Sequence, residues 1–560
     1  MKASLFVTLM WGLLLSIGST MALWTGNATA QKFQAVAFTS LEGDTLAAAY
    51  FPGTVEAGVL LLPDFNGNQA MMQPIASEFV LRGLHVFIFD YSGHGQSDGT
   101  MYFDDTRTNR IAQQVLAAKE EFKRLSGLTD PQIVVVGHGM GARETLQAAT
   151  MDTRQVAGLI LIGTQINLTI NPQSLFFAGT SDRDLEWVQN LNYNNPPVGI
   201  VLISGTLDDI LSPENAELLY DQLNSSAYSA AILARPLRFE IGFRTLRRIA
   251  GFHNFEIYHP NVIREVVMFA QHFLPFGFNP SYTEVTRSSE SSFVYWRFIF
   301  WFTGIVGIFI LLIGGVKYTK PKSSSISTRI EITSQRFVIA KCVMWFASVP
   351  LFLGLMAIFF VLPIPCPMFG LLYVGSIGAH GILTWLLYYF GKMPGTEGKL
   401  PFTVDHIGQN IRLTVALTFG LMVITGLYAA TGWFNPLPTM VRLRWMVICV
   451  PIAAVGFWLG HHESRMIKVY TRGDTLRQST MQGALSLINL LPFLVCLVML
   501  ALMGSSSNVI VGLQGLLILV LVILFGKLLN NLKQPLWVIA VAQATVLCWL
   551  ILPLSALFSL

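Results

Sequence analysis

The stretch that decides the fold of the first half of this chain is QIVVVGHGMGAR, residues 132–143. Residues 133–136 form a short, unbroken apolar run, which predicts a buried strand. The glycines that follow predict a sharp turn, and the residues after the turn predict a helix. The middle glycine of this turn is Gly139, which has no side chain and so offers no group that can attack a substrate.

The composition of the 560 residues indicates a membrane protein. Hydrophobic residues make up 53% of the chain and charged residues 12%, whereas about 25% of the residues of a soluble protein are charged. The net charge of +4 is spread thinly and predicts no nucleic-acid surface. The cysteines all lie in the apolar C-terminal half, at Cys342, Cys366, Cys449, Cys496 and Cys548. They predict neither a disulfide framework in residues 31–294 nor a metal site, and no cofactor is expected.

Strands and helices alternate in the first half of the sequence. Short apolar runs predict buried strands at residues 57–63, 84–90, 133–136, 156–163 and 198–204. Helical patterns lie between and after them, as at residues 109–124 and 261–273. Strands that alternate with helices predict a mostly parallel sheet covered on both faces.

Several ordered motifs resemble one known superfamily. The segment DYSGHGQSDG, residues 90–99, is similar to the pattern D-x-x-G-H-G-x-S-x-G. The turn at residues 137–141 has the layout of the nucleophile elbow, G-x-S-x-G. Residues 33–275 therefore resemble the α/β-hydrolase superfamily, near its lysophospholipase-like and serine-aminopeptidase-like members. The resemblance implies an α/β-hydrolase fold with a mostly parallel sheet.

The resemblance also assigns the residues of a catalytic triad. Gly139 stands at the nucleophile position, Asp208 at that of the acid and His253 at that of the base, in the family's chain order. The backbone amides of Met140 and Phe65 are expected to line the oxyanion hole. The segment PDFNG, residues 63–67, departs from the family here, because the family usually has a His-Gly pair at this place.

The glycine at position 139 allows three interpretations. A glycine adopts the positive φ of such a turn at little cost, so it stabilises the fold once catalysis is not needed. Alternatively, the missing side chain leaves room for a ligand group or for a water activated by His253. A third interpretation is another nucleophile, namely Ser92, Asp64 or Ser204. No acyl-enzyme can form at position 139 itself, because the attacking hydroxyl is absent.

The N-terminus predicts export. Lys2 precedes an apolar run over residues 5–23, and the tripeptide at residues 28–30 is Ala-Thr-Ala. This order is typical of a secretory signal peptide over residues 1–30, and an uncleaved signal anchor is the close alternative. Either segment directs residues 31–294 across the membrane.

The C-terminal half predicts an all-α domain of eight membrane-spanning helices over residues 295–560. The apolar stretches lie near residues 297–316, 337–362, 367–391, 411–433, 443–461, 483–503, 508–526 and 536–558. Lysines and arginines gather in the loops on one side, whereas the other side offers only Arg442 and Arg444. The positive-inside rule therefore makes the lysine-rich loops cytoplasmic. Residues 31–276, a linker at 277–294 and the C-terminus are expected outside the cytoplasm.

Few polar residues interrupt these apolar stretches. His380 has Ser376 and Thr384 one turn to either side, and we interpret it as a hydrogen-bonded packing residue. The segment GHHESR, residues 460–465, is the densest polar group. It could bind a metal, a phosphate headgroup or a partner, but we interpret it as a helix end that meets water beside anionic lipid. Charged residues near the span centres are too few to indicate an ion-coupled pump.

The function expected from these features is that of a membrane-embedded, hydrolase-like protein with a degenerate triad. It would bind a lipid or acyl ligand, or a partner protein, at the outer face of the cell membrane, as a subunit of a larger membrane complex. The alternative is an active hydrolase of lipid or acyl esters that uses activated water or an atypical nucleophile. A transporter with a regulatory outer domain is a third class, which rests only on the number of helices.

Overall fold

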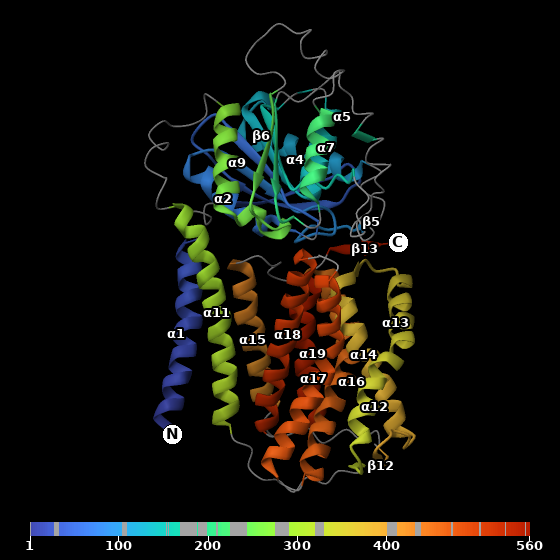
Figure 1. The fold of residues 1–560 in the computed structure, drawn as a ribbon. Helices are drawn as coiled ribbons and strands as arrows, with labels where there is room; N and C mark the ends of the chain where they lie inside the picture. Colours follow the sequence, from blue (N-terminus) through green and yellow to red (C-terminus); the bar gives the residue numbers. More distant parts are fainter. Residues whose placement is uncertain are drawn as a thin grey trace.

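The computed structural model divides into an α/β domain and a helical domain (Figure 1). It describes the chain except for residues 1, 27–32, 66, 103–108, 153, 155, 169–186, 189–198, 209–210, 224–242, 275–289, 320–329, 400–410, 432–437, 472–473, 503–505, 533, 555 and 560. Most of the predicted linker at 277–294 lies outside the described residues.

Eight strands form the sheet of the α/β domain in the order β1-β2-β4-β3-β6-β7-β8-β9. Their bounds are β1 Gln34–Thr39, β2 Thr45–Phe51, β3 Gly58–Leu62, β4 His85–Phe89, β6 Ile133–His138, β7 Gly158–Ile162, β8 Gly199–Gly205 and β9 Phe243–Ile249. β2 is antiparallel to both of its neighbours, and every pair from β4 to β9 is parallel. The central strands are buried on both faces, which is why they are continuous Val, Ile and Leu runs. The predicted parallel sheet is confirmed.

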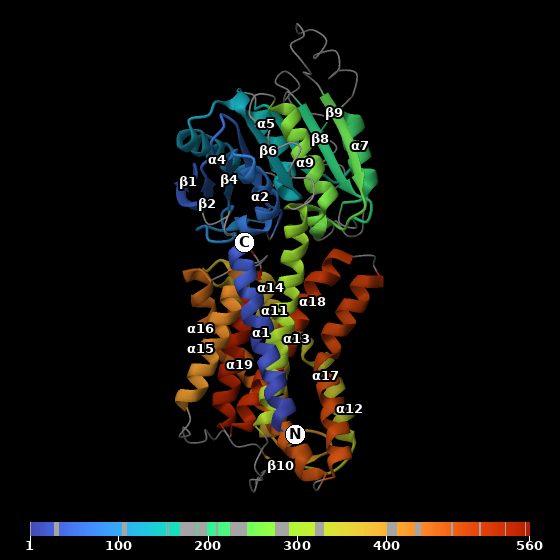
Figure 2. The ribbon, with the colours of Figure 1, turned by 90° about the vertical axis from the view of Figure 1, so that its left-hand side faces the viewer.

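Helices cover both faces of this sheet, as expected (Figures 1 and 2). α2 (Gln73–Leu81) and α9 (Pro260–Phe273) pack on one face with one apolar cluster. α4 (Arg110–Ser126), α5 (Met140–Met151) and α7 (Pro213–Leu223) pack on the other face with a second cluster. Parallel strands bring their carboxyl ends to one edge, so the loops after β3, β6, β8 and β9 meet there.

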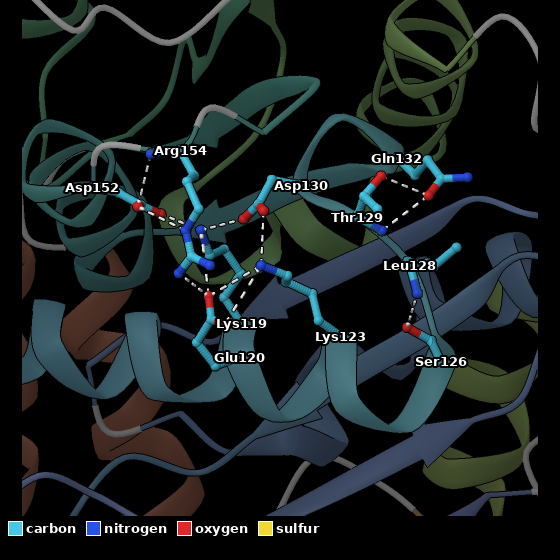
Figure 3. Close-up of polar contacts among 10 residues, drawn as sticks. All are labelled: Lys119, Glu120, Lys123, Ser126, Leu128, Thr129, Asp130, Gln132, Asp152 and Arg154. Carbon is cyan, nitrogen blue, oxygen red and sulfur yellow. Dashed lines mark hydrogen bonds and ion pairs between the residues drawn. The ribbon is translucent and has the colours of Figure 1, made fainter.

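A network of charges secures α4 to the loops around it (Figure 3). The ammonium group of Lys119 is nearly buried and contacts the carboxylates of Asp130, at 2.5 Å, and of Asp152. Lys123 contacts Asp130 at 2.7 Å. Opposite charges that are enclosed in this way are screened less than surface pairs, so the network contributes to holding α4 on the sheet.

The helical domain consists of long apolar helices (Figure 2). They are α11 Glu290–Tyr318, α12 Arg336–Ala347, α13 Val349–Val361, α14 Met368–Tyr389, α15 Ile411–Thr431, α16 Met440–Tyr470, α17 Thr475–Leu502, α18 Ser506–Asn531 and α19 Leu536–Ile551. α12 and α13 occupy the single span expected at 337–362. The helix is interrupted between them at Ser348, two residues before Pro350. β10 (Ile330–Ile332) and β12 (Thr396–Gly398) pair at the end away from the α/β domain.

Seven helices in the described part of the chain are long and apolar enough to cross a membrane. Six of them fall on predicted stretches, and the seventh is the N-terminal segment at Phe6–Leu23. α15 also contains a described apolar helical segment at Ile411–Gly426. These helices are consistent with a membrane protein, while the expected count of eight stays a prediction.

The N-terminal helix α1 (Lys2–Gly26) lies along α11 in both views (Figures 1 and 2). The hydroxyls of Ser19 and Thr303 are 2.9 Å apart. A Cβ atom on Gly307 would lie 2.5 Å from Oγ of Ser16, so glycine permits the close approach of the two helices. Whether this segment is a cleaved signal peptide or an uncleaved signal anchor stays a prediction.

The two domains are joined by a small three-stranded sheet. β13 (Leu557–Ser559), at the C-terminus, pairs in parallel with β5 (Met101–Tyr102) and antiparallel with β11 (Cys366–Pro367). β5 belongs to the α/β domain and β11 to the helical domain, so the last residues of the chain link them. The α/β domain and the C-terminus therefore lie at the same end of the helical domain (Figure 1).

The interior of the helical domain contains a pair of opposite charges, one of which was expected in water. Glu463 was expected at a helix end in water, but its side chain is 1% exposed and lies 2.9 Å from the ammonium group of Lys341. The prediction for Glu463 is therefore wrong. The two residues come from α16 and α12, and a pair formed between distant helices leaves no local pattern in the sequence.

Candidate functional site

The turn between β6 and α5 has the backbone geometry that its glycines predict. Gly139 has φ 56° and ψ −116°, a conformation that residues with a Cβ atom rarely adopt. A Cβ atom on Gly137 would lie 2.4 Å from the carbonyl oxygen of Gly141, and one on Gly141 would lie 2.5 Å from that of Pro63. The flanking glycines therefore let α5 start close to the ends of β6 and β3.

Asp208 and His253 meet beside this turn. Asp208 follows β8, and His253 begins the short helix η5 (His253–Tyr258) after β9. Nδ1 of His253 lies 2.8 Å from Oδ2 of Asp208, and both side chains are almost fully buried. The other oxygen of Asp208 accepts a hydrogen bond from the amide of Leu211. The pair has the geometry of an acid that orients a base.

The carboxylate of Asp64 fills the place where a side chain at position 139 would lie. A Cβ atom on Gly139 would be 1.8 Å from Oδ1 of Asp64. The same oxygen accepts a hydrogen bond from the amide of Met140 at 2.7 Å. The second oxygen, Oδ2, lies 3.1 Å from Nε2 of His253. The structure thus brings together a row of three groups, Asp64, His253 and Asp208, beside a glycine.

His253 lies between two carboxylates, and this decides its charge. Burial alone would lower its pKa, but Asp208 and Asp64 raise the pKa well above its ordinary value. Burial would likewise raise the pKa of Asp64, yet the positive charge of His253 holds that pKa below its usual value. Each ring nitrogen faces a carboxylate oxygen, so both nitrogens donate when the ring is protonated and both carboxylates are ionised. The raised pKa of His253 and the lowered pKa of Asp64 both favour this arrangement, an imidazolium between two carboxylates.

The charge of His253 gives a prediction for pH titration. In full-length protein labelled with ¹⁵N in its histidine rings, His253 is expected to stay doubly protonated above pH 7. Asp64→Asn removes one of the two facing charges, so the midpoint of the His253 titration should fall to a lower pH. Long-range ¹H–¹⁵N NMR spectra measure both midpoints.

An internal control comes from His94, whose pKa is lowered by burial to about 4. Its signal should remain that of a neutral ring in both proteins. The raised pKa of His253 also means that its contribution to stability is fully present below about pH 6.5 and is lost as pH rises through the folded-state pKa. A His253 signal that titrates near pH 6.5 in both proteins would contradict the arrangement.

A second pair of groups, His138 and Glu256, lies next to His253. The His138 ring stacks on that of His253 with centroids 4.9 Å apart, and its Nε2 donates to the carbonyl oxygen of His253 at 3.0 Å. Glu256 accepts a hydrogen bond from the amide of Gly205, and burial raises its pKa. Glu256 was not predicted as a site residue from the sequence, although it lies three residues after His253.

These residues bring metal-ligand atoms together without forming an evident metal site. His138, His253 and Glu256 each place one such atom within 4.8 Å of the others. Both nitrogens of His253, however, already face Asp208 and Asp64. An imidazolium has no lone pair for a metal, so binding would require the loss of a proton from this ring.

The remaining candidate residues have other partners. The amide of Met140, expected in the oxyanion hole, donates to Asp64. The Phe65 ring packs against Phe558 of β13, at 5.7 Å between centroids, while the role of its amide stays a prediction. Ser92 donates its hydroxyl hydrogen to Asp44 and is fully buried. Ser204 is buried within β8. Of the three alternative nucleophiles, Asp64 is the one in contact with His253.

The segment at residues 90–99 connects this site to the helical domain. Asp90 accepts hydrogen bonds from the amides of Gln69 and Gln96, which shapes the loop from within. On the side of this loop that faces the helical domain, the carbonyl oxygen of Gly93 accepts a hydrogen bond from the amide of Leu557 at 2.9 Å. The guanidinium of Arg442 donates to the carbonyl oxygens of Gly93 and Gly95, at 3.3 and 3.1 Å.

Residues 53–190 match the family described as Serine aminopeptidase, S33. The matched segment carries β3, β4, β6 and β7 and the turn at Gly139. This segment is α/β-hydrolase-like. The family match lies within the α/β domain, which we call the hydrolase-like domain from here on, and it gives no information about the helical domain.

Curated relatives and solved structures resemble part of the chain. "Uncharacterized protein YfhR" of Salmonella typhimurium is 24% identical over 220 residues, 34% of this chain and 70% of the relative. The protein of that name in Escherichia coli is 25% identical over 199 residues, 33% of this chain and 67% of the relative. The alpha/beta hydrolase GrgF from Penicillium has a TM-score of 0.34 and 19% identity over 44% of this chain and 99% of its own. The Pyrococcus furiosus esterase Pf2001 has a TM-score of 0.33 and 17% identity over 44% of this chain and 92% of its own.

Proposed function

We propose that the hydrolase-like domain is silent in acyl transfer and serves as a binding module of a multi-pass membrane protein. The observation that carries this proposal is the position of the Asp64 carboxylate. It occupies the space beside Gly139, accepts from the Met140 amide and faces Nε2 of His253.

Three requirements of serine-type acyl transfer are missing at once. Gly139 supplies no hydroxyl, so no acyl-enzyme can form. The Met140 amide already donates to a carboxylate, so it is not available to a developing oxyanion. His253 is held as an imidazolium, which cannot accept a proton from a nucleophile. Restoring the hydroxyl at position 139 alone would leave the other two unmet.

The binding role follows from the surroundings of the silent site. Phe65 adjoins Asp64 and packs on Phe558 of the C-terminal strand, so the site lies close to the junction with the helical domain. A lipid or acyl ligand, or a partner subunit of a membrane complex, is the class of molecule that such a place favours. The excess of lysine and arginine in the opposite loops supports an extracytoplasmic hydrolase-like domain and C-terminus.

The test uses the purified full-length protein in detergent. We expect no labelling by a fluorophosphonate probe and no hydrolysis of p-nitrophenyl esters of short or long acyl chains above the rate of His253→Gln. Matched rates in the two proteins support silence. Turnover in the unmodified protein that His253→Gln abolishes would overturn the proposal.

The second candidate function is hydrolysis by Asp64 itself, and its contact with His253 favours it. The Asp64 carboxylate would attack the alkyl carbon of an ester substrate, expel the carboxylate of the acyl group and form a new ester with that alkyl group. Water would then attack the carbonyl carbon of the Asp64 ester and release the alcohol, which restores the carboxylate. Alternatively, the carboxylate would take a proton from an attacking water.

An isotope experiment separates this candidate from silence. If a substrate is turned over in H₂¹⁸O by a covalent route, ¹⁸O enters the Asp64 carboxylate, and mass spectrometry of the peptide detects it. Asp64→Asn should then abolish turnover. Turnover that persists in Asp64→Asn would exclude Asp64 as the catalyst, whereas no turnover in any of the proteins supports the silent domain.

A further inference from the structure

The helical domain encloses a cavity of about 470 Å³. Its wall is formed by α12, α14, α16, α17, α18 and α19. Lys341 lies near the start of α12, which follows β10 at the end away from the hydrolase-like domain (Figure 2). The cavity is therefore distinct from the triad, and its volume lies within the range of small-molecule binding sites, about 300–1,000 Å³.

A buried ionic group lies on one side of this cavity. The ammonium group of Lys341 lies 2.9 Å from Glu463 and 2.8 Å from Nε2 of His380. The hydroxyl of Tyr388 donates to Glu463 at 3.0 Å. The His380 ring stacks on Trp345, with centroids 4.0 Å apart. Burial of charged side chains among membrane-spanning helices costs free energy, and such residues commonly mark functional positions. This group therefore indicates more than helix packing.

The charge of Glu463 is already balanced by Lys341, so the cavity has no free acidic group among its described lining residues. Lys527 of α18 also lines the cavity and is exposed, and it forms no ion pair within the described part of the chain. A cationic ligand would therefore meet an unpaired positive charge. An anionic ligand would meet a cation suited to a carboxylate or a phosphate.

Hydrogen-bonding groups surround the same space. The ring of His461 contacts Gln543 at 2.7 Å, and Gln482 donates to the hydroxyl of Ser464 at 3.1 Å. Further amides and hydroxyls line the wall at Ser479, Ser486, Asn489 and Asn530. They supply donors that can bind the oxygens of an anionic group.

The rest of the wall is apolar. Aromatic and aliphatic side chains face the cavity at Trp345, Phe457, Leu490, Phe493, Leu519 and Ile523. A wall with a cationic, donor-rich part and an aromatic part fits a molecule that has a charged head and a hydrocarbon chain. Close contact of α14 and α16 at Gly381 and Gly456 shapes one side, because a Cβ atom on Gly381 would lie 2.6 Å from the amide nitrogen of Gly456.

We propose that this cavity binds a single-chain anionic amphiphile. Its carboxylate or phosphate head contacts Lys527 and the surrounding amides and hydroxyls, and its chain lies along Phe457, Leu490 and Phe493. The Lys341–Glu463 pair positions α12 and α16 around the ligand. The proposal concerns the helical domain alone and does not depend on silence of the triad.

Glycines of the wall provide variants that fill the cavity without strain. A Cβ atom on Gly460 or on Gly483 would meet no atom within 4 Å, and both residues line the cavity. A side chain can therefore start at either position without a clash, and we expect leucine there to fill part of the cavity. Gly354 of α13 is equally open and is absent from the described lining, so Gly354→Leu is the matched control.

The experiment measures binding of radiolabelled palmitate and hexadecyl phosphate to full-length protein in phosphatidylcholine nanodiscs. We expect saturable binding of at least one of them, and the comparison identifies the head that is preferred. Gly460→Leu and Gly483→Leu should weaken binding by about tenfold or more, which corresponds to about 1.4 kcal/mol. Gly354→Leu should bind as the unmodified protein does. Lys527→Glu should weaken binding, and Lys527→Arg should preserve it.

Competition defines the ligand class. Hexadecyltrimethylammonium has the chain with the opposite charge, and acetate and inorganic phosphate have the charge without the chain. None of them should displace the labelled ligand at equal concentration. The proposal is overturned by a lack of saturable binding of both anionic probes, by effective competition from any of the three, or by equal effects of Gly460→Leu and Gly354→Leu. Unchanged melting temperatures of the unliganded variants show that a loss of binding is not a loss of fold.

Discussion

Gly139→Ser alone is expected to leave the protein unreactive, whereas Gly139→Ser combined with Asp64→Gly is expected to create a fluorophosphonate-reactive serine. In the single variant, the new Cβ atom would meet Oδ1 of Asp64 at 1.8 Å, so the side chain and the carboxylate cannot share the space. The Met140 amide and His253 would also remain engaged with Asp64. The reactivity of both variants is measured by fluorophosphonate labelling and by hydrolysis of p-nitrophenyl esters.

The double variant removes all three obstacles. Without Asp64, the Met140 amide becomes available to an oxyanion, and His253 faces Asp208 alone at 2.8 Å. The pKa of His253 should fall once one of its two carboxylates is gone, so the ring can again accept a proton. Loss of the serine in a well-studied protease reduces turnover by about a millionfold, so a gain of about 10² to 10³ over the unmodified protein is a modest expectation.

A third protein, the double variant with His253→Gln, controls for reactivity that does not depend on the base. Its serine should label slowly or not at all. Equal labelling of the single and double variants would show that Asp64 does not block the site. A double variant that stays unreactive while it melts normally would show that the triad geometry is lost for some other reason.

The sequence predicts the hydrolase-like domain well because its signals are local. Unbroken apolar runs predict β3, β4, β6, β7 and β8 to within a few residues, since buried parallel strands need such runs. The elbow is local too, because positive φ and close backbone approach restrict residues 137, 139 and 141 to glycine. β9, at the edge of the sheet, and the strands of the interdomain sheet, with two or three residues each, were not predicted. Such strands depend on their partners.

The position of Asp64 beside Gly139 depends on tertiary structure. Asp64 and Gly139 are far apart in sequence, and their contact arises because β3 and β6 pair in parallel, with Leu62 opposite Gly137. Two loops that leave one edge at adjacent strands must meet, so the register of the sheet would have indicated this contact. The sequence analysis named Asp64 as an alternative nucleophile but did not predict that it fills the place of the missing side chain.

The buried charges of the helical domain escaped prediction for another reason. A linear sequence does not show how far one helix is displaced along another. Glu463 stands just after the apolar stretch at 443–461, so it was interpreted as part of a helix end in water. Lys341 stands near the start of the stretch at 337–362, and no partner was predicted for it. α12 and α16 run antiparallel, so the start of one lies near the end of the other and the two side chains meet inside the domain.

Arg442 is the other residue whose replacement should have a large effect, because it joins the two domains. Its side chain is fully buried and donates to two carbonyl oxygens of the segment at residues 90–99. A buried polar group that loses its partner costs about 1–3 kcal/mol, and more where a charge is involved. Since the carbonyl of Gly93 also accepts from Leu557, the loss should extend to the C-terminal strand.

Arg442→Met is therefore expected to weaken the interdomain junction by about 2–4 kcal/mol, since it removes a charged donor from each of two backbone carbonyl groups. Hydrogen exchange should accelerate at residues 93–102 and 557–559, while β6 in the centre of the sheet keeps its protection. Arg444→Met is the matched control, because Arg444 lies two residues further along α16 and is exposed. Equal exchange in the two variants would contradict the role of Arg442. Faster exchange confined to the junction would show that the helical domain holds the loop at residues 90–99 in place. A change in the packing of α16 could then affect Phe65 and Asp64 through the C-terminal strand.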